Sequence, residues 1–461
     1  MATIAENLTL LKSTKAGIKA AIEAKGVSNV GDKFSDYPAK IASIPTGGST
    51  SGVSQWTGTV DRAGLTELGW STTDIDNLQA NVRWYDWQNP DYTVVDADKS
   101  ITAINQYNGN KNVRYAKMLD TSQVTNMTSV FNDCSSLISI PTLDTSKVTN
   151  MEVMLQDCPS LTSIPTLNTS QVTNMSGMFK NCTSLTSIPT LDTSKVIYIG
   201  SMFSGCSSLT TIPALDTSQA TNTVYMFWGC TSLTSIPALD TSKATDMDSM
   251  FFGCSRLTSI PALNTSQVTN MSSMFYDCSS LTSIPTLDTS QVTNMYSMFY
   301  RCTSLTSIPA LDTSKVTNMY SMFYGCSSLT SIPALDTSKV TDMYSMFNNC
   351  TSLTTIESID FSSCTNTGNM FPSYYDYSKL TSMHVTGSIS FNWTSGGFSS
   401  IPNLDFDSIK SILEAMNRCT NPETAKTMSF KATMTDQDSQ LTNLVSECNG
   451  KGWTITGLTI N

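Results

Sequence analysis

Charge is scarce in this sequence of 461 residues. It has 26 lysine and arginine residues against 37 aspartate and glutamate residues, a formal net charge of −11, and a single histidine, His384. Binding to nucleic acid needs clustered basic side chains, and the basic residues here form no cluster, so we expect no nucleic acid partner. One histidine cannot build a His-rich metal site or a paired-histidine proton relay, so the composition predicts neither a metal nor another cofactor.

Long hydrophobic runs are absent as well. No apolar stretch approaches the ~18 to 20 residues that a membrane-spanning helix requires, so we expect no membrane insertion. The first residues, Met-Ala-Thr-Ile-Ala-Glu-Asn, contain no basic region followed by an apolar core. We therefore expect no secretory signal at this end of the sequence.

What the sequence does contain is a repeat. Ten of the thirteen cysteines are spaced 24 residues apart: Cys134, Cys158, Cys182, Cys206, Cys230, Cys254, Cys278, Cys302, Cys326 and Cys350. A unit of this length cannot bury its own apolar face, so neighbouring units must stack and share one core. The repeat therefore predicts a leucine-rich-repeat-like solenoid, mainly β with parallel strands, of about eleven 24-residue coils over 118–371.

The apolar residues that recur in every unit are predicted to point inward. In the unit that contains Pro309 they are Leu305, Ile308, Leu311, Val316, Met319, Met322, Phe323 and Cys326. The Leu-Thr-Ser-Ile segment predicts a short strand that ends at the proline, and the alternating Val-Thr-Asn-Met segment predicts a second strand. Asp-Thr-Ser predicts a turn between them, and Met-Phe-Tyr-Gly-Cys predicts a corner of one helical or 3₁₀ turn.

The regularly spaced cysteines are predicted to be small apolar residues in a stacked ladder. Identical side chains in register point the same way, which is poor geometry for a disulfide bridge. The spacing also lacks the Cys-x-x-Cys pairs that are typical of zinc sites.

The recurring motif Asp-Thr-Ser-x-Val-Thr-Asn-Met-x-x-Met-Phe-x-x-Cys extends from Asp120 to Phe371. It resembles the BspA-like leucine-rich repeats of bacterial surface proteins. The resemblance implies extracellular recognition or adhesion rather than catalysis. The motif is broken at 154–155, 197–199 and 223–224, where an apolar residue nearby should preserve the coil.

Residues 1–45 predict a helical attachment or oligomerisation segment. A helix over 3–25 has a narrow apolar seam of coiled-coil type, formed by Ile4, Leu8, Leu11, Ile18 and Ile22. We expect it to dock on a partner or to form a homo-oligomer, with a trimer favoured; packing within its own short domain is the alternative. Residues 18–45 are similar to a short module of tail and fibre proteins of gut bacteriophages, including crAss-like phages. That resemblance implies attachment to a virion.

The remaining segments predict a linker and two caps. Residues 46–52 predict a flexible linker, and 53–117 predict an aromatic-rich cap over the first coil. Residues 372–461 predict an α+β cap with helices at 407–417 and 436–448 and strands at 427–432 and 453–456. His384 has no identifiable partner in the sequence, so we interpret it as an ordinary surface or cap histidine.

One position outside the core varies strongly from unit to unit. The residue after Met-Phe is aromatic from the fifth unit to the ninth, and a second row of tyrosines precedes the same Met-Phe pair. The candidate receptor-binding residues are Trp228, Phe252, Tyr276, Tyr300 and Tyr324 in the first row and Tyr296, Tyr320 and Tyr344 in the second. Stacking predicts an aromatic ridge that could bind sugar rings or a protein. The alternative is that these rings lie flat against neighbouring coils and only thicken the wall.

A row of aspartates, including Asp288, Asp312 and Asp336, could suggest a cation or glycosidase site. Formation of the turn explains the row more simply, because Asn168 and Asn264 replace aspartate without disturbing the unit. Glycoside cleavage also needs two carboxylates in different environments, whereas identical repeats give identical ones. We therefore expect no catalytic residues.

These patterns together predict a non-enzymatic, virion-attached receptor-binding protein of a phage, assembled in the host cytoplasm and exposed outside the cell. Its predicted partners are other virion proteins, through the N-terminus, and a host cell-surface glycan or protein. A secreted bacterial BspA-like adhesin is the first alternative, and a fibre-borne polysaccharide depolymerase is the second.

Overall fold

The computed structural model describes residues 121–393, 397–419 and 426–461, with short pieces at 53–55, 84–86, 107–111, 113 and 116. Strands β1 (Val53–Gln55) and β2 (Trp84–Asp86) pair in antiparallel fashion. The predicted N-terminal helix with its seam, the linker at 46–52 and most of the aromatic-rich segment 53–117 lie outside the described residues.

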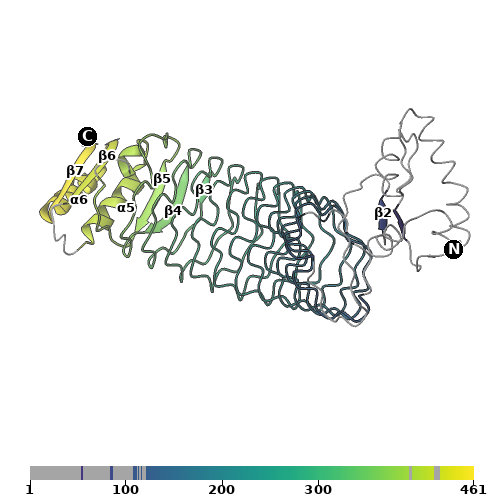
Figure 1. Ribbon diagram of the computed structural model, residues 1–461. Helices are drawn as coiled ribbons and strands as arrows, with labels where there is room; N and C mark the ends of the chain where they lie inside the picture. Colours follow the sequence, from purple (N-terminus) through teal and green to yellow (C-terminus); the bar gives the residue numbers. More distant parts are fainter. Residues whose placement is uncertain are drawn as a thin grey trace, which may run out of the picture.

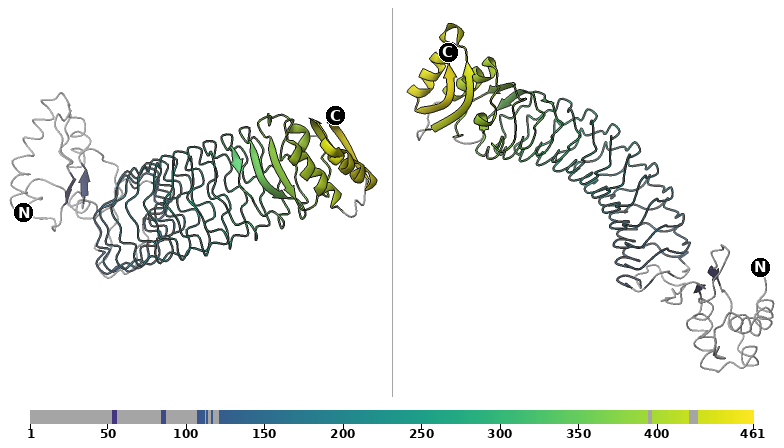
Figure 2. Two further views of the ribbon diagram at one scale, coloured as in Figure 1. Left: turned by 180° about the vertical axis from the view of Figure 1, so that it is seen from behind. Right: turned by 90° about the horizontal axis from the view of Figure 1, so that it is seen from above.

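From residue 121 onward the chain winds into a curved column of stacked coils (Figures 1 and 2). Parallel bridges join residues 24 positions apart in an unbroken series from the Asn126–Asn150 pair to the Asp342–Asn366 pair. Each repeat in this span therefore forms one coil, and equivalent residues of neighbouring coils lie side by side.

The predicted strands are mostly shorter than expected. In most coils the Val-Thr-Asn-Met segment contributes a single bridge residue, such as Asn294. Regular strands form at the C-terminal end, where β3 (Ser331–Ile332), β4 (Thr355–Asp360) and β5 (Ser382–Thr386) make a parallel sheet in that order. The reason is the recurring proline, which has no N–H to donate to a ladder. In β4 and β5 that position is taken by Glu357 and His384, so the pairing continues.

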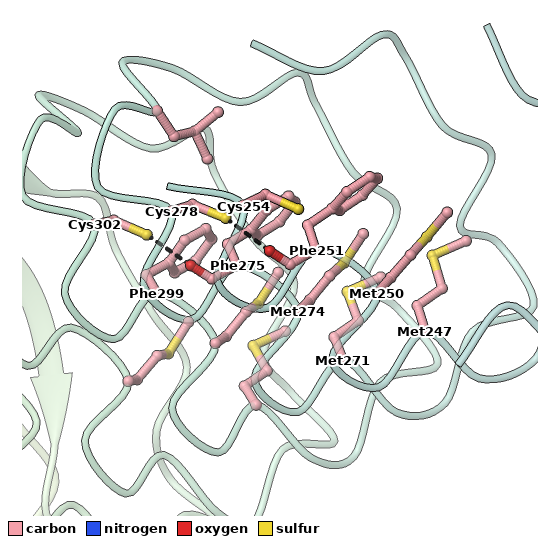
Figure 3. Packing of buried hydrophobic residues seen from close by; sticks show 14 of the residues in the cluster. Met247, Met250, Phe251, Cys254, Met271, Met274, Phe275, Cys278, Phe299 and Cys302 are labelled. Carbon is pink, nitrogen blue, oxygen red and sulfur yellow. Dashed lines mark hydrogen bonds between the residues drawn. The ribbon is translucent and has the colours of Figure 1, made fainter. Parts of the chain in front are cut away.

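The predicted inward residues are confirmed as the core. The eight residues predicted for the unit around Pro309 are at most 8% exposed. The phenylalanines of the Met-Phe pairs form one internal stack from Phe179 to Phe371, with ring centroids 5.5–5.8 Å apart and planes within 21° of parallel. Figure 3 shows part of this stack beside two rows of methionines.

The corner is not a regular helix, although its hydrogen bonds are of the 3₁₀ type. The corner is a series of tight turns, in which the N–H groups of Met274, Tyr276 and Cys278 each donate to the carbonyl three residues earlier. Two backbone positions per coil have positive φ, which interrupts any helix. The first is held by Ser129, Val153, Gly177, Ser201, Tyr225, Ser249, Ser273, Ser297, Ser321, Ser345 and Asn369. The second is held by Asp133, Asp157, Asn181, Gly205, Gly229, Gly253, Asp277, Arg301, Gly325 and Asn349.

The cysteines form the predicted apolar ladder. All thirteen are free thiols and all are buried. The thiol of Cys278 donates to the carbonyl of Phe251 at 3.1 Å, and Cys302 makes the same bond to Phe275 at 3.0 Å (Figure 3). The Phe251 carbonyl also accepts the N–H of Cys254. The thiol thus satisfies the remaining lone pair of a buried carbonyl while it fills the core.

The predicted α+β cap is confirmed. It contains η2 (Gly397–Ser400), α5 (Phe406–Asn417), β6 (Lys426–Met434), η3 (Gln437–Ser439), α6 (Gln440–Gly450) and β7 (Trp453–Ile460), and β6 pairs in parallel with β7. Helix α5 packs on β5, the last strand of the column. Two buried serines of α5, Ser408 and Ser411, accept the N–H groups of Met383 and Val385 in β5. The helix therefore satisfies an edge that has no further coil to pair with.

The phenylalanine stack should carry much of the stability. We expect Phe251→Ala to lower the free energy of unfolding by about 3–5 kcal/mol, because it deletes a fully buried ring. The measurement is urea unfolding followed by tryptophan fluorescence. Phe252→Ala, next to it but only half-buried, is the matched control and should cause a smaller loss. Equal losses at the two positions would contradict the assignment of Phe251 to the core.

The thiols of the column should react slowly in the folded protein. Burial raises the pKa of the Cys326 thiol to about 12 and raises that of Cys350 well above its usual value, so the reactive thiolate is scarce at pH 8. We expect a colourimetric thiol reagent to label these cysteines only after guanidinium unfolding. A control with reductant added beforehand should give the same count, because the thiols are free. Rapid labelling at Cys326 in the native protein would show that the core opens.

Candidate ligand-binding face

The first aromatic row forms a continuous ladder of stacked rings, which we call the aromatic ladder: Trp228, Phe252, Tyr276, Tyr300 and Tyr324. Neighbouring ring centroids are 5.6, 4.3, 4.2 and 4.5 Å apart along this order. The planes of the last four rings are within 7° of parallel. The rings therefore lie against one another, an arrangement that fits both the predicted ridge and the alternative that the rings thicken the wall.

The second row also stacks. Tyr296, Tyr320 and Tyr344 have ring centroids 5.1 and 5.2 Å apart. The hydroxyl of Tyr344 accepts a hydrogen bond from the amide of Asn369 at 2.7 Å. Tyr296, at the open end of this row, is 39% exposed. The structure thus forms both predicted rows.

Stacking decides what the aromatic ladder can offer to a ligand. Each inner ring has its faces covered by its neighbours, so what remains for a ligand is the ring edge and, in Tyr276 and Tyr300, the hydroxyl. Burial raises the pKa of Tyr276 and of Tyr300 above the ordinary tyrosine value, so both hydroxyls remain protonated and able to donate at neutral pH.

The two ends of the aromatic ladder differ. Beyond Tyr324 the row continues to Asn348, which is 2% exposed and whose amide lies 3.5 Å from the hydroxyl of Tyr374. Beyond Trp228 the row continues to the small residue Ser204. Trp228 is 39% exposed, the largest exposed fraction in the ladder. Its ring is the one best placed to stack with a ligand.

A hollow lies beside the aromatic ladder, lined by Thr231, Gly253, Ser255, Asp277, Ser279, Arg301 and Thr303. The hydroxyls of its wall donate to the carbonyl one coil earlier, as Ser279 does to Ser255 at 3.3 Å and Thr303 to Ser279 at 3.1 Å. Their lone pairs remain available to accept. The hollow therefore presents a regular row of acceptors next to the aromatic edges and hydroxyls.

Arg301 is the unusual residue of this hollow. It has a φ of 55°, at a position that the other coils give to glycine, aspartate or asparagine. Its Nε atom lies 3.4 Å from the carboxylate of Asp277. A Cβ atom on Gly325 would lie only 3.1 Å from the Arg301 Cγ, so glycine in the next coil leaves room for the arginine. A strained backbone and a small neighbour both support a side chain with a role beyond the fold.

The aspartate row forms turns, as predicted. Asp288, Asp312 and Asp336 each accept the N–H of the serine two residues later, at 3.0–3.1 Å. Side-chain hydrogen bonds from these serines lower the pKa of the three carboxyls, so they are ionised at neutral pH. Within the described residues, no three His, Cys, Asp or Glu side chains gather in a metal-like group. His384 is exposed on β5 at the position of the recurring proline.

Sequence reasoning found the aromatic ladder but missed the hollow. A signal was available, because Arg301 is the only cation at a corner position otherwise held by small or turn-forming residues. Apolar spacing, on which the predicted core rests, carries no information about this polar position. The hollow is formed by the serine and threonine row together with Gly253, Asp277 and Arg301 of successive coils, an arrangement that spacing alone does not give.

The coils and their shared core define a leucine-rich-repeat protein of the BspA-like kind. The chain belongs to the family described as "Mycoplasma protein of unknown function, DUF285", whose model matches residues 99–211, 162–258, 208–306 and 281–384. These overlapping matches extend over more than half of the chain. The family matches do not extend to residues 18–45, for which the resemblance to phage modules stays a prediction, and no curated protein matches the sequence.

Several solved structures are similar at low identity. They include a leucine-rich repeat protein from Eubacterium ventriosum that is 17% identical. The match covers 62% of this chain and 87% of that protein, with a TM-score of 0.35. A leucine-rich repeat protein from T. pallidum is 18% identical, with coverages of 52% and 85% and a TM-score of 0.22. The functional domain of InlJ from Listeria monocytogenes, described as including a cysteine ladder, is 15% identical, with coverages of 74% and 76% and a TM-score of 0.19. In the part of this chain that the structure describes, no helix has the length and apolarity needed to span a bilayer.

The strain at Arg301 can be measured. A glycine adopts positive φ at a free-energy cost that is lower by about 1 kcal/mol or more than that of an arginine. An exposed ion pair such as Arg301–Asp277 contributes less than about 1 kcal/mol to the free energy of unfolding. We therefore expect Arg301→Gly to leave the free energy of unfolding unchanged or slightly higher in a urea titration. Gly325→Arg is the reverse control, and it should be destabilising because it places a side chain at the same backbone position with φ of 74°. A large loss of stability in Arg301→Gly would assign Arg301 a structural role.

Proposed function

We propose that this chain is a non-enzymatic recognition protein displayed on a surface, and that the aromatic ladder and the hollow beside it bind a cell-surface glycan or protein. The observation that carries the proposal is the ladder itself. Five coils in succession place a stacked aromatic side chain at a position that other coils give to Asn, Gln, Lys or Ser. The fold does not require aromatic rings there, so the rings serve a purpose outside the core.

The chemistry of this face favours binding over catalysis. It combines ring edges, tyrosine hydroxyls, a row of hydroxyl acceptors and one paired arginine. Such groups hold a hydroxyl-rich or peptide ligand by many weak contacts. The aspartates of the turns are bonded to their own serines, and none of the described ones forms a carboxylate pair with the differing environments of a glycosidase.

Membership of the DUF285 family and the BspA-like repeats support display on a bacterial surface as an adhesin. The second candidate, a virion-attached receptor-binding protein, depends on the similarity of residues 18–45 to phage modules. In that case the seam of Ile4, Leu8, Leu11, Ile18 and Ile22 would attach it, with a trimer favoured. Mass spectrometry of purified virions and immunolabelling of intact bacteria distinguish the two. A third possibility, a depolymerase, would release reducing ends from capsular polysaccharide.

The binding role is tested on the aromatic ladder. We expect Tyr276→Ala, Tyr300→Ala and Tyr324→Ala, combined, to lower binding of the labelled protein to cells by about tenfold or more, as the loss of a central aromatic cluster does at other interfaces. Flow cytometry on panels of bacterial and epithelial cells gives the readout. The matched control is Thr269→Ala, Thr293→Ala and Thr317→Ala, which alters three exposed side chains elsewhere on the same repeat series.

A companion variant separates binding from stability. Replacing the same three tyrosines by phenylalanine keeps the ring stack and removes only the hydroxyls. An intermediate loss of binding with an unchanged melting temperature would show that the hydroxyls contribute directly. Wild-type binding by the triple alanine variant, with the threonine control also unchanged, would reject the aromatic ladder as the binding face.

A further inference from the structure

A second exposed surface lies where the repeat is broken. Six large hydrophobic side chains are exposed in the part of the chain that the structure describes, and three of them fall in 197–225: Ile197, Tyr198 and Tyr225, at 38%, 52% and 42%. We call these three the 197–225 patch. Tyr198 is bridged to Asn222, and the N–H of Ser201 donates to the carbonyl of Val224, so the patch occupies two neighbouring coils.

Tyr198 does not make the side-chain hydrogen bond that its equivalents make in the other coils. In the ten other coils of the bridge series, an asparagine or aspartate stands at this position and accepts the N–H two residues later, as Asn222 does from Val224 at 3.0 Å. Tyrosine has no acceptor at that reach, so this coil lacks the bond. Ile197 likewise replaces a threonine that recurs in the other coils, such as Thr173 and Thr221.

The backbone conformation of Tyr225 is also unfavourable for a tyrosine. Its φ is 57°, at the corner position where most other coils have serine, glycine or asparagine. Side chains with a Cβ atom avoid this conformation, and a bulky one has little to gain from it. Three substitutions that each weaken the repeat, gathered on two coils, indicate selection for the surface that they make.

The patch has an acidic border. The backbone N–H of Tyr225 donates to the carbonyl of Asp248 at 3.0 Å, and a hydrogen bond to the Asp248 side chain raises the pKa of the tyrosine. Asp246 lies in the row of Tyr198, two coils further along. Neither carboxylate takes part in an ion pair with another described residue. Lys243, the lysine of the same repeat, donates instead to Gln219 at 2.6 Å.

We propose that the 197–225 patch, with Asp246 and Asp248, is a docking surface for a partner protein that presents lysine or arginine beside apolar side chains. Exposed tyrosines supply contact area and ring faces for a cation, and the two carboxylates, which no described cation neutralises, supply the opposite charge. None of the three patch residues lines the hollow or belongs to the aromatic ladder, although the carbonyl of Tyr225 accepts the N–H of Trp228 at 3.1 Å. Binding at the patch does not require the aromatic ladder to bind its own ligand.

The structure suggests variants that restore the repeat. Ile197→Thr, Tyr198→Asn and Tyr225→Ser, combined, return the three positions to the residues of other coils and leave the net charge unchanged. This variant should be at least as stable as the wild type. Asp246→Asn with Asp248→Ser removes the acidic border and retains a side chain at 246 that accepts the same N–H. Tyr374→Ser, which deletes a tyrosine that is 70% exposed on the cap, is the matched control.

The probes are three labelled peptides of equal length built from Lys-Leu-Ser, Glu-Leu-Ser or Ser-Leu-Ser repeats. We expect the lysine peptide alone to bind the full chain in fluorescence anisotropy, with an affinity about tenfold lower in the restored-repeat variant and in the acidic-border variant. The Tyr374→Ser control should bind like the wild type. Cell binding through the aromatic ladder should persist in both patch variants, which distinguishes this proposal from the proposed function.

Three results would overturn the proposal. The first is equal binding of the lysine peptide by the wild type and the restored-repeat variant. Binding of this peptide would then be explained by the net negative charge of the protein alone. The second is equal binding of the acidic peptide. The third is self-association of the wild type in sedimentation that the restored-repeat variant lacks, which would assign the surface to a second copy of the chain.

Discussion

The stacking of each coil on the next is the interaction on which the rest of this structure depends. No coil buries its own leucines, methionines and phenylalanine; each face is covered by the equivalent residues of a neighbour. Because the covering side chains are identical, a substitution at an inward position must fit between two copies of the residue that it replaces. This explains why phenylalanine, cysteine and methionine scarcely vary along the column, whereas outward positions do.

This constraint determines what could be predicted from the sequence. The inward residues, the cysteine ladder, the aspartate turns and the cap could be predicted because they follow from apolar spacing and local hydrogen bonding. The length of the strands could not, since it depends on whether Pro309 and its equivalents block a ladder that Glu357 and His384 allow to continue. The corner was predicted only in part: its 3₁₀-type hydrogen bonds are present, but no regular helix forms. A Met-Phe-Tyr-Gly-Cys segment looks helical by composition, but two positive φ angles per coil turn the chain instead.

The candidate sites show a similar division. Alignment of Tyr276 with Tyr300 follows from the period alone, but their face-to-face contact depends on side-chain orientation. The contribution of Arg301 was not evident, because its environment is made by residues one coil away on either side. In both the hollow and the 197–225 patch, the residues that suggest a binding role are those that differ from the repeat consensus. Such a difference can be interpreted only when the structure shows what the consensus residue does in the other coils. In this protein the candidate binding residues are thus found mainly where the sequence differs from the repeat consensus.

The two serines of α5 affect whether molecules of this protein can add to one another through the last strand of the column. A column of parallel strands ends in an unpaired row of N–H and C=O groups, which could template the addition of another molecule and lead to fibres. Ser408 and Ser411 occupy the N–H groups of Met383 and Val385 from within the same chain. Addition of another column at this edge of β5 is therefore hindered by a helix of the same chain.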